Sequence, residues 1–596
     1  MTDAQSPTDY ADGTLSTTRG RAEGAFLGAA IGDALGWPHE MRATRASRSQ
    51  RVAALGFESW TKRSGGRFQP HEETIAAGHY SDDTQLILAG ARALLRAPAN
   101  WWEILAMEEL PLWTAYQRGG GGATKRAAAS WLTGKAPWKA KPADVERYFS
   151  AGGNGVAMRV LPHCLRHAAS ANYAGLATDI MTDGVTTHGH PRALVGALAY
   201  GYGLWQAFRH RGTLNYGQLF AVVLAGAADW GSMPPLRGRW EGWRDAAFRQ
   251  QSYEALWAQT VREQADLLDL CGKALAGGAA VIDEDALKTF GCFDRRVNGS
   301  GTVNAAAAIY LASRHAVEPV RGVTQAALSE GADTDTLASM VGALLGAAVG
   351  LEWTRQFAQE LQDERVIRQV ADELRELGTH NDRLGSPHAV TKVSLSTFLS
   401  ELSEMHEASS VTLPNGLQAH AQPWNGVVSK SKSLLASAWK LTLEDGQTLF
   451  FKKLSKTLTD MPQETQEVPG PPSDAVGAVS PPIHLGFRLV VSNLSRSTAF
   501  YQEVLGLPVS KRTAKSVNLG GVLSIGEADK MPDAAGAITV FVEVRDLALS
   551  RSCYIKHLPE EHLRIDEWED RTRLLCRDPD GYKLELYQLK RQLKPS

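Results

Sequence analysis

The chain has few cysteines, no long apolar run and almost no net charge, and each of these absences excludes a class of protein. Its five cysteines among 596 residues are far apart and lack metal-binding spacing, which argues against a disulfide framework and against a zinc site. No uninterrupted apolar run could span a bilayer, and the polar N-terminus lacks the apolar core of a signal peptide. We therefore expect a cytoplasmic protein with reduced thiols and no membrane partner.

Positive and negative charges are nearly balanced along the chain. There are 63 lysines and arginines against 65 aspartates and glutamates, and the formal net charge is −2. Because nucleic-acid-binding domains carry a concentrated basic surface, this balance gives no strong signal for a nucleic-acid partner. A chain of 596 residues is also too long for one hydrophobic core, which predicts several domains.

Changes in composition divide the chain into five segments. We predict a disordered tail, an all-α domain, a small α/β-containing module, a linker and a duplicated α+β domain, at residues 1–20, 21–378, 379–458, 459–482 and 483–590 respectively. The second segment is rich in alanine and leucine with helical periodicity. The third contains the hairpin signal Asp445-Gly446 between alternating runs, and nothing in its sequence indicates its role. The last segment repeats a strand, helix and strands pattern, which indicates an internal duplication.

Glycines recur at every fourth position in two apolar segments of the predicted helical domain. They are Gly24, Gly28, Gly32 and Gly36 in the first segment and Gly342, Gly346 and Gly350 in the second. This spacing places small residues along one face of a helix. A second helix backbone can then approach that face closely.

Two clusters of aspartate and hydroxyl residues each precede an apolar run that is predicted to be helical. Ser81-Asp82-Asp83-Thr84 precedes residues 85–95, and Gly331-Ala332-Asp333-Thr334-Asp335-Thr336 precedes residues 337–350. Aspartates spaced i, i+2 cannot share a helix face, so they belong to the turn or first residues of the helix. Either cluster alone is an ordinary helix cap. Together the clusters could form an all-oxygen site for Mg²⁺, Ca²⁺ or Mn²⁺, because their carboxylates would repel each other without a cation.

Four further motifs lie in the same segment. They are GDALGWPHE, GGATKRAAASW, GGNGVAMRVLP and TTHGHPRALVGALAYGY, at residues 32–40, 121–131, 152–162 and 186–202. Taken in order with the two aspartate clusters, they resemble the ADP-ribosylglycohydrolase family, also called ADP-ribosyl-acceptor hydrolases, over about residues 20–378. The resemblance implies an all-α bundle with a two-magnesium centre in a cleft, and Mn²⁺ is also compatible with such a centre.

The same resemblance implies roles for individual residues. The implied metal ligands are Ser81, Asp82, Asp83, Asp333, Asp335 and Thr336. Glu40 and Asp83 are implied at the reacting centre, Glu40 in a catalytic or water-orienting role. Asn154, Gly155 and His188 are implied to bind the substrate, since open N–H groups in a glycine-rich loop can hold a diphosphate. Outside this context, Glu40 would be interpreted as a surface carboxylate, the GGNG loop as a turn and His188 as a core histidine.

Three further positions bear on the resemblance. Ala332 stands where the family usually has a second glycine, and alanine would be mildly strained there if the backbone required a positive φ. His190 is a less favoured candidate for ligand contact than His188. The loop at residues 119–122 resembles a flexible loop of the family near the acceptor side.

The sequence thus predicts a magnesium-dependent hydrolase that cleaves the glycosidic bond between ADP-ribose and a modified acceptor, through an oxocarbenium-like state. The motifs are compatible with an ADP-ribosylated protein (through arginine or serine), a nucleobase or a small molecule as substrate. Two alternatives stay open. One is a non-catalytic, ADP-ribose-binding or structural member of the family, and the other is a resistance protein whose specificity comes from the C-terminal domain.

That C-terminal domain resembles the vicinal oxygen chelate superfamily, which includes glyoxalases and bleomycin-resistance proteins. The motifs SNLSRSTAFYQEVLGL and RDPDGYKLELYQ carry the resemblance. Of the positions that would hold a metal in that superfamily, Gly486 and Thr539 are not ligand types and only Glu585 is. Since one carboxylate does not hold a catalytic cation, we predict a metal-free binding or dimerising module. A homodimer formed through this domain is compatible with that prediction.

Overall fold

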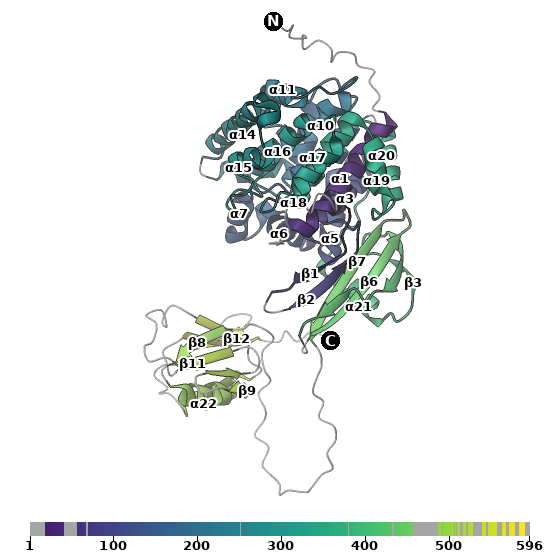
Figure 1. The fold of residues 1–596 in the computed structure, drawn as a ribbon. Coiled ribbons are helices and arrows are strands. Elements are labelled where there is room, and N and C mark those ends of the chain that lie inside the picture. The colour runs from purple at the N-terminus through teal and green to yellow at the C-terminus, as the bar shows by residue number, and fades with distance from the viewer. Residues whose placement is uncertain are drawn as a thin grey trace. The chain divides into compact units, whose positions relative to one another are not determined.

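The structure is a computed structural model. It describes residues 18–40, 56–66, 69–250, 252–379, 381–431 and 434–456 and parts of 487–589. The chain forms two compact units, residues 1–461 and 462–596, which are described separately. The first unit is mostly helical (Figure 1).

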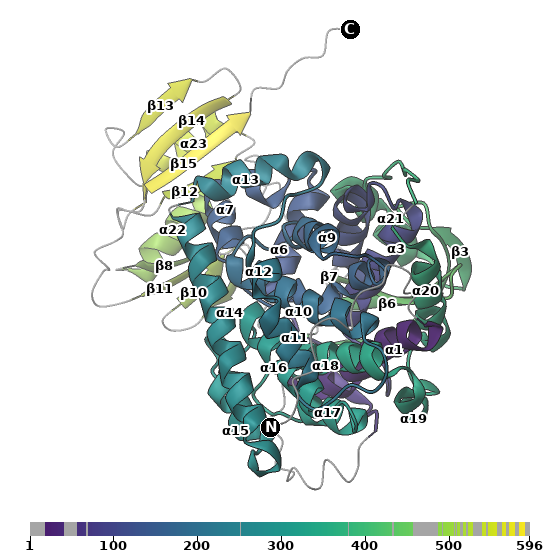
Figure 2. The same ribbon diagram turned by 90° about the horizontal axis from the view of Figure 1, so that it is seen from above.

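Helices α1 and α18 lie side by side inside the first unit, and both are buried along most of their length (Figures 1 and 2). The longer helices of this unit are α1 (Arg19–Glu40), α3 (Asp82–Arg96), α10 (Pro191–Arg209), α14 (Tyr253–Ala276), α16 (Gly301–Arg314) and α18 (Thr334–Val349). Shorter helices include α5 (Leu110–Tyr116), α6 (Gly122–Leu132), α7 (Pro142–Phe149), α9 (Ala174–Gly184), α17 (Pro319–Ala327) and α20 (Glu364–Leu377). The apolar runs predicted after the two aspartate clusters are α3 and α18.

The glycines of α1 and α18 let the two backbones touch. A Cβ atom added to Gly28 would lie 2.2 Å from the carbonyl oxygen of Gly342, and one added to Gly36 would lie 2.2 Å from that of Thr334. Real Cβ atoms do not approach other atoms so closely, so any side chain at these positions would force the helices apart. The predicted close helix contact is confirmed. It fixes the C-terminal end of α1, which carries Glu40, beside the N-terminal end of α18.

A hairpin interrupts the helical part of the first unit between α1 and α3. Strands β1 (Trp60–Ser64) and β2 (His71–Ile75) pair antiparallel, and β2 also pairs with β5 (Val427–Ser429), which lies some 350 residues further along the chain. The segment predicted to be all-α is therefore mostly helical with one inserted hairpin. The hairpin was not predicted because its sequence is strongly polar and lacks the apolar alternation of an ordinary strand pair. It can form because residues distant in the sequence neutralise its charges.

The remaining strands of the first unit form a sheet of order β3-β4-β6-β7 after helix α21 (Lys392–Glu404). They are β3 (Ser409–Thr412), β4 (Gln418–Pro423), β6 (Leu434–Leu443) and β7 (Thr448–Lys456). The predicted hairpin turn at Asp445-Gly446 joins β6 to β7, and Gly446 has a φ of +92° that glycine adopts without strain. Trp439, Leu441 and Phe451 of this sheet belong to the same hydrophobic core as the helices. The sheet is therefore built onto the helical part.

Polar contacts also join this sheet to the helices. The guanidinium of Arg92 on α3 donates hydrogen bonds of 2.7 and 2.6 Å to Gln447 Oε1, in the turn before β7. The rings of Tyr116 on α5 and Phe451 on β7 lie 5.6 Å apart. Residues of the segment 379–458 thus contact both the helix that carries Asp82 and Asp83 and the segment that precedes the glycine-rich loop.

The second unit repeats one arrangement twice. Its sheets have the orders β8-β11-β10-β9 and β12-β15-β14-β13, and in each half a helix follows the first strand. The first half comprises β8 (Phe487–Val491), α22 (Leu494–Leu505), β9 (Val509–Arg512), β10 (Ser516–Leu519) and β11 (Leu523–Glu527). The second comprises β12 (Thr539–Glu543), α23 (Leu547–Tyr554), β13 (Arg564–Glu567), β14 (Arg571–Arg577) and β15 (Lys583–Leu589). The duplication predicted from the sequence pattern is present in the fold.

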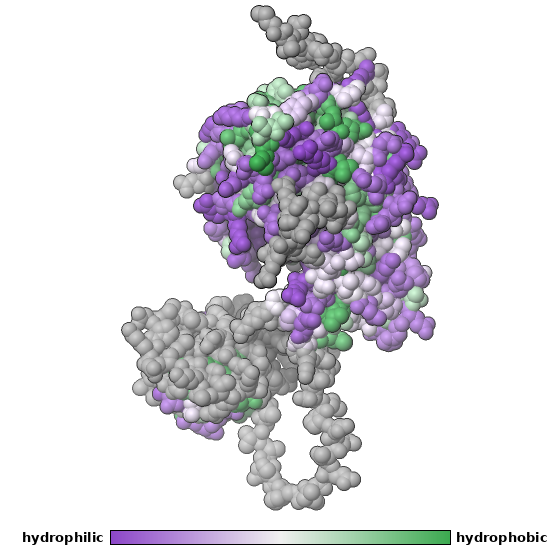
Figure 3. Space-filling view, viewed as in Figure 1, coloured by the Kyte–Doolittle hydropathy of each residue, from purple (hydrophilic) through white to green (hydrophobic). Residues whose placement is uncertain are grey.

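None of the described helices is long and apolar enough to cross a membrane. The face of the first unit that Figure 3 shows is mostly hydrophilic, with hydrophobic residues in scattered groups. Such scattered apolar residues are ordinary on a folded surface and mark no interface by themselves.

Candidate functional site

The two aspartate clusters meet in one place, although 253 residues separate their contacting members. Thr336 Oγ1 on α18 donates a hydrogen bond of 3.2 Å to Asp83 Oδ2 on α3. Asp82 and Asp83 occupy the first turn of α3, whereas Asp333 is the N-cap residue of α18 and Asp335 lies in its first turn. Helix starts carry partial positive charge, which favours the gathering of carboxylates there.

Glu40 joins the same group of carboxylates from the end of α1. One carboxylate oxygen from each of Glu40, Asp333 and Asp335 lies within 4.8 Å of the other two. Asp335 is buried, Asp333 is half-buried and Glu40 is exposed, so the cluster extends from the interior to solvent. Asn154 Nδ2 donates a hydrogen bond of 3.0 Å to Asp333 Oδ2 and fixes that carboxylate.

The start of α3 is held by two different caps. Ser81 Oγ accepts a hydrogen bond of 3.4 Å from the backbone N–H of Asp83, so the capping interpretation of this cluster is also correct. The fully buried carboxylate of Asp33 accepts hydrogen bonds from the backbone N–H groups of Ser81 and Thr84, at 2.9 and 3.0 Å, and from Thr84 Oγ1 at 2.7 Å. Asp33 thereby sets the position of Asp82 and Asp83.

Sequence reasoning missed Asp33 as a site residue, and it missed the turn at Asn298-Gly299. Asp33 lies within the motif at residues 32–40, so the motif could have indicated it. The turn contacts the site from two sides, because Gly299 accepts a hydrogen bond of 2.9 Å from the backbone N–H of Asn154 and Asn298 Nδ2 donates one of 3.1 Å to the carbonyl of Gly331. Its sequence, NGSG, is that of an ordinary turn.

The gathered carboxylates carry unfavourable negative charge. Burial, and then the charge of Asp33, raises the pKa of Asp82 to about 8 and that of Asp83 well above its usual range. Burial also raises the pKa of Asp335 well above its usual range, and Glu40 and Asp333 add to the shift. Glu40 is exposed as a residue, but the partial burial of its carboxylate, and then the charge of Asp333, raise its pKa to about 7. The arrangement therefore favours bound protons or a bound cation.

One buried oxygen of this group has no hydrogen-bond partner. Asp83 Oδ1 is inaccessible to solvent and receives no hydrogen bond from any described residue. An unpaired buried carboxylate oxygen costs free energy unless a ligand binds it. The donor set around it consists of carboxylate and hydroxyl oxygens, which are the ligands that hard divalent cations prefer. The residues present thus fit a divalent metal centre.

His188 and Gly155 lie against each other beside the carboxylates. A Cβ atom at position 155 would lie 2.9 Å from His188 Cε1, so a side chain there would displace the imidazole. His188 and Thr187 are both buried, and a hydrogen bond of 2.8 Å joins His188 Nδ1 to Thr187 Oγ1. Arg159 Nη2 donates a hydrogen bond of 2.9 Å to the same Thr187 oxygen. Burial, and then the charges of Arg159 and Arg126, lower the pKa of His188 to about 3. The imidazole is neutral at neutral pH.

The other sequence positions of interest are also placed. His190 Nδ1 accepts a hydrogen bond of 3.1 Å from the backbone N–H of Arg192 and caps α10. Ala332 does not adopt a positive φ and is unstrained, because Gly331 takes the left-handed conformation at +91°. Gly119 has a φ of +98°, and a Cβ atom added to it would lie 2.9 Å from Asp82 Oδ1. The glycine-rich loop therefore lies directly beside the carboxylates.

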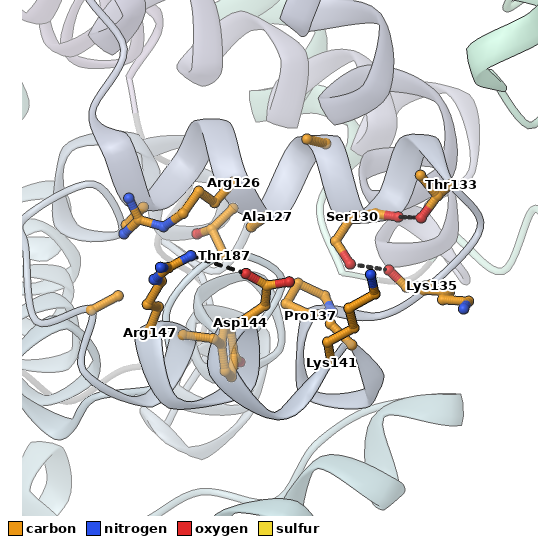
Figure 4. Close-up of a pocket in the computed structure, with 15 residues that line it drawn as sticks. Arg126, Ala127, Ser130, Thr133, Lys135, Pro137, Lys141, Asp144, Arg147 and Thr187 are labelled. Carbon is orange, nitrogen blue, oxygen red and sulfur yellow. Dashed lines mark hydrogen bonds and ion pairs between the residues drawn. The ribbon is translucent and has the colours of Figure 1, made fainter. Parts of the chain in front are cut away.

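A cavity of about 690 Å³ lies between α6 and α7, next to His188 and the GGNG loop. Its walls include Thr187 and Ala151, which are the neighbours in sequence of His188 and of that loop. Four basic side chains line it, namely Arg126, Lys135, Lys141 and Arg147. Arg147 pairs with Asp144, whereas Arg126 extends along the start of α6 (Figure 4). Its volume lies in the range of small-molecule sites, and its charge favours an anionic ligand.

The mostly helical bundle, with a carboxylate centre at the starts of α3 and α18, defines the class of this protein. Residues 14–383 match the model of the ADP-ribosylglycohydrolase family, and the chain belongs to that family. The predicted family is thereby confirmed. The protein is accordingly a hydrolase of ADP-ribose linkages, from a family that is typically metal-dependent.

Solved structures similar to parts of the chain were also found. An ADP-ribosylglycohydrolase-related protein complex is 22% identical over 61% of this chain and 99% of its own, with a TM-score of 0.36. Lactoylglutathione lyase from Agrobacterium tumefaciens is 18% identical over 18% of this chain and 96% of its own, with a TM-score of 0.14. An integron cassette protein from the mobile metagenome of V. cholerae is 24% identical over 18% and 94%, with a TM-score of 0.14. No curated protein matches the chain.

Proposed function

We propose that this protein is a magnesium-dependent hydrolase that releases ADP-ribose from a modified acceptor and so reverses ADP-ribosylation. The observation that carries the proposal is the 3.2 Å contact between Thr336 and Asp83, which unites the two aspartate clusters. The adjoining group of Glu40, Asp333 and Asp335 extends the united cluster to solvent, where a substrate can reach it.

Six oxygen-bearing side chains would hold the metal. They are Ser81, Asp82, Asp83, Asp333, Asp335 and Thr336, and the unpaired Asp83 Oδ1 supports a cation among them. When bound, Mg²⁺ would supply Lewis acidity and would hold ribose hydroxyls in a fixed orientation. Asp33 and Asn154 hold the two aspartate clusters in position. Asp33 accepts a hydrogen bond from the start of α3, and Asn154 donates one to Asp333. Mn²⁺ suits the same oxygen donors.

Glu40 is the member of the cluster that solvent reaches, and we assign it the orientation of the attacking water. Its carboxylate lies close to Asp333 and Asp335, so a water hydrogen-bonded to Glu40 would be held beside the substrate carbon at the centre. The neighbouring carboxylates would also stabilise the positive charge that develops on the sugar during cleavage of the glycosidic bond. Asp83, at the base of the cluster, shares this electrostatic role.

The loop at Asn154-Gly155 and His188 would bind the diphosphate. Arg159 donates to Thr187 Oγ1, so the hydroxyl hydrogen of Thr187 is available for His188 Nδ1. This arrangement leaves the proton of the neutral imidazole on Nε2, where it can be donated to a phosphate oxygen. The basic cavity beyond Thr187 would receive the far end of the same ligand, with Arg126 next to the phosphates.

Release of ADP-ribose by the purified full chain tests the proposal. The substrates are peptides ADP-ribosylated on arginine or serine and an ADP-ribosylated nucleobase, each with and without Mg²⁺. We expect release from at least one substrate, and a loss on the order of 100-fold or more in Asp83→Asn and Asp333→Asn. Asp266→Asn, on an exposed face of α14, is the matched control and should behave as the wild type. Equal release by all four proteins would refute the metal assignment.

Calorimetry separates this proposal from a non-catalytic role. Binding of ADP-ribose that depends on Mg²⁺, without release from any substrate, would identify a binding protein in place of a hydrolase. If the protein neither binds ADP-ribose nor releases it from a substrate, both roles are contradicted.

For the C-terminal unit we propose a vicinal-oxygen-chelate-like module that binds a small molecule or a second copy of the chain without a catalytic metal. The twofold repeat of one strand order supports the module type. Glu585, the one ligand-type residue at the expected positions, lies 3.4 Å from Arg573 and is already paired with a cation. Stoichiometric binding of nickel or zinc by the full chain that is lost in Glu585→Gln would contradict this proposal.

A further inference from the structure

The hairpin β1–β2 places a lysine near the carboxylate centre. Trp60, Lys62 and Ser64 alternate along β1 with the exposed Thr61 and Arg63, so the first three face the protein. Lys62 Nζ lies 4.8 Å from the ring centroid of Trp37, and the rings of Trp37 and Trp60 meet edge to face at 5.2 Å. The ammonium group is thus held on an aromatic surface.

Trp37 connects this lysine to the site. A Cβ atom built on Gly119 would lie 3.3 Å from Trp37 Nε1 and 2.9 Å from Asp82 Oδ1, so the indole and the Asp82 carboxylate flank the same glycine. Lys62 is therefore separated from the carboxylate centre by one indole ring. Glu40, at the end of the helix that carries Trp37, is the other carboxylate on this side.

Lys62 has no ion-pair partner among the described residues. Its cross-strand neighbour is Glu73, but both oxygens of Glu73 are already bound, one by Arg118 Nε at 2.7 Å and the other by Lys452 Nζ at 2.8 Å. Burial, and to a smaller extent the charge of Lys452, lower the pKa of the Lys62 ammonium, whereas the charges of Glu73 and then of Asp82 and Glu40 oppose that shift. A half-buried cation without a pair carries a cost in stability, which a ligand would offset.

The residues on the two sides of the carboxylate centre indicate which part of the ligand lies near Lys62. Asn154, the GGNG loop and His188 lie on the Asp333 side, where the proposed function puts the diphosphate. Gly119 and Trp37 lie on the Asp82 side. If the diphosphate extends to the first side, the acceptor must leave the ribose on the second, beside Lys62.

We propose that Lys62 is a specificity-determining residue that selects acceptors with anionic groups next to the glycosidic bond, such as a modified side chain in an acidic peptide segment. The inference rests on the proposed function and narrows its acceptor class. The fixed ammonium attracts such groups, and it repels an acceptor surrounded by arginine or lysine.

The test compares two peptides that carry ADP-ribose on the same type of residue, one flanked by acidic and one by basic residues. We expect kcat/KM of the wild type to favour the acidic peptide. Lys62→Gln should lower that preference about tenfold, and Lys62→Glu should reverse it. Arg63→Gln removes the same charge from the next residue, whose side chain is 86% exposed and pairs with Glu72, and it should leave the preference unchanged.

The possible outcomes separate the inference about Lys62 from the proposed function. A preference that is equal in the wild type and Lys62→Gln would overturn the inference and leave the proposed function standing. An equal loss of activity on both peptides in Lys62→Gln would also overturn it, because Lys62 would then act on the carboxylate centre and not on the acceptor. If the wild type releases ADP-ribose neither from the two peptides nor from the substrates of the first assay, both proposals fail.

Discussion

Gly36 is the position where a single methyl group should separate the carboxylates of the candidate site. In Gly36→Ala the new Cβ atom would lie 2.2 Å from the carbonyl oxygen of Thr334 and 2.7 Å from the Cα atom of Asp335, at the very start of α18. Both neighbours are backbone atoms and cannot rotate away. The ends of α1 and α18 must therefore move apart.

The size of that movement can be worked out from the contact. To bring the Cβ–oxygen distance to 3.0 Å, the shortest that real structures tolerate, the two helix ends must separate by about 0.8 Å. Overpacking of this kind costs about 1–3 kcal/mol of unfolding free energy. Glu40 lies one helical turn beyond Gly36 and moves with it, and a displacement of about 1 Å at a reacting group costs on the order of 100-fold in rate.

Two control variants separate packing from positioning. Gly24→Ala brings the new Cβ atom to 2.6 Å from the carbonyl carbon of Gly350, a milder clash at the far end of the same helix pair, so it should lower stability with a much smaller loss of activity. Gly90→Ala in α3 meets only Pro162 Cγ at 4.0 Å, and it should be neutral or stabilising by up to about 1 kcal/mol because alanine favours a helix over glycine. Denaturant unfolding and ADP-ribose release are measured for all three variants.

The reasoning would be refuted if Gly36→Ala retained both wild-type stability and wild-type turnover. It would also be refuted if Gly24→Ala and Gly36→Ala lost activity equally. In that case the loss would follow from destabilisation alone, and the position of Glu40 beside Asp333 and Asp335 would not matter.

Three further predictions concern charge and domain limits. Without metal, Asp83→Asn should melt at a higher temperature than the wild type because the substitution relieves carboxylate repulsion. Mg²⁺ should raise the melting temperature of the wild type more than that of the variant. A larger Mg²⁺ shift in the variant would contradict this. Burial alone would raise the pKa of Glu73, but Arg118 and Lys452 lower it from 4.5 to about 2. Its contribution to stability is thus complete above pH 4.5 and is lost as the pH falls towards 2, so Glu73→Gln should flatten the acid dependence of the unfolding free energy. Residues 1–461 alone should keep activity, whereas residues 1–380 should unfold readily because the sheet after α21 completes their core; full activity of the shorter fragment would contradict this.

The helices and their close contact could be predicted from local patterns. The apolar runs after each aspartate cluster have helical periodicity, and the four-residue glycine spacing indicates which faces meet. The chemistry of the acidic clusters also indicated that they would gather, since two sets of hard oxygen donors suit one cation. Each of these patterns lies within a few helical turns of sequence, although the segments that they bring together are far apart in the chain.

The parts that could not be predicted depend on distant partners. The strands β1 and β2 carry Lys62 and Glu73 on the side that faces the protein, and such charges are compatible with a buried strand only because Arg118 and Lys452 neutralise Glu73. Asp33 is an isolated charge in an apolar helix, and although the motif around it could have indicated it as a site residue, its hydrogen bonds to the start of α3 become evident only in the fold. Pairing of β2 with β5 joins segments that no local pattern connects.

Glu73 joins three segments that the ribosome makes at very different times. Its carboxylate binds Arg118, next to the glycine-rich loop, and Lys452, in the last strand of the first unit. A nascent chain that has emerged only as far as α20 already contains every residue assigned to the carboxylate centre, but Glu73 then has only Arg118 of its two cationic partners, because Lys452 has not yet been made. Competence to process substrate should therefore appear late in translation, when β7 leaves the exit tunnel and the wall beside the loop becomes rigid.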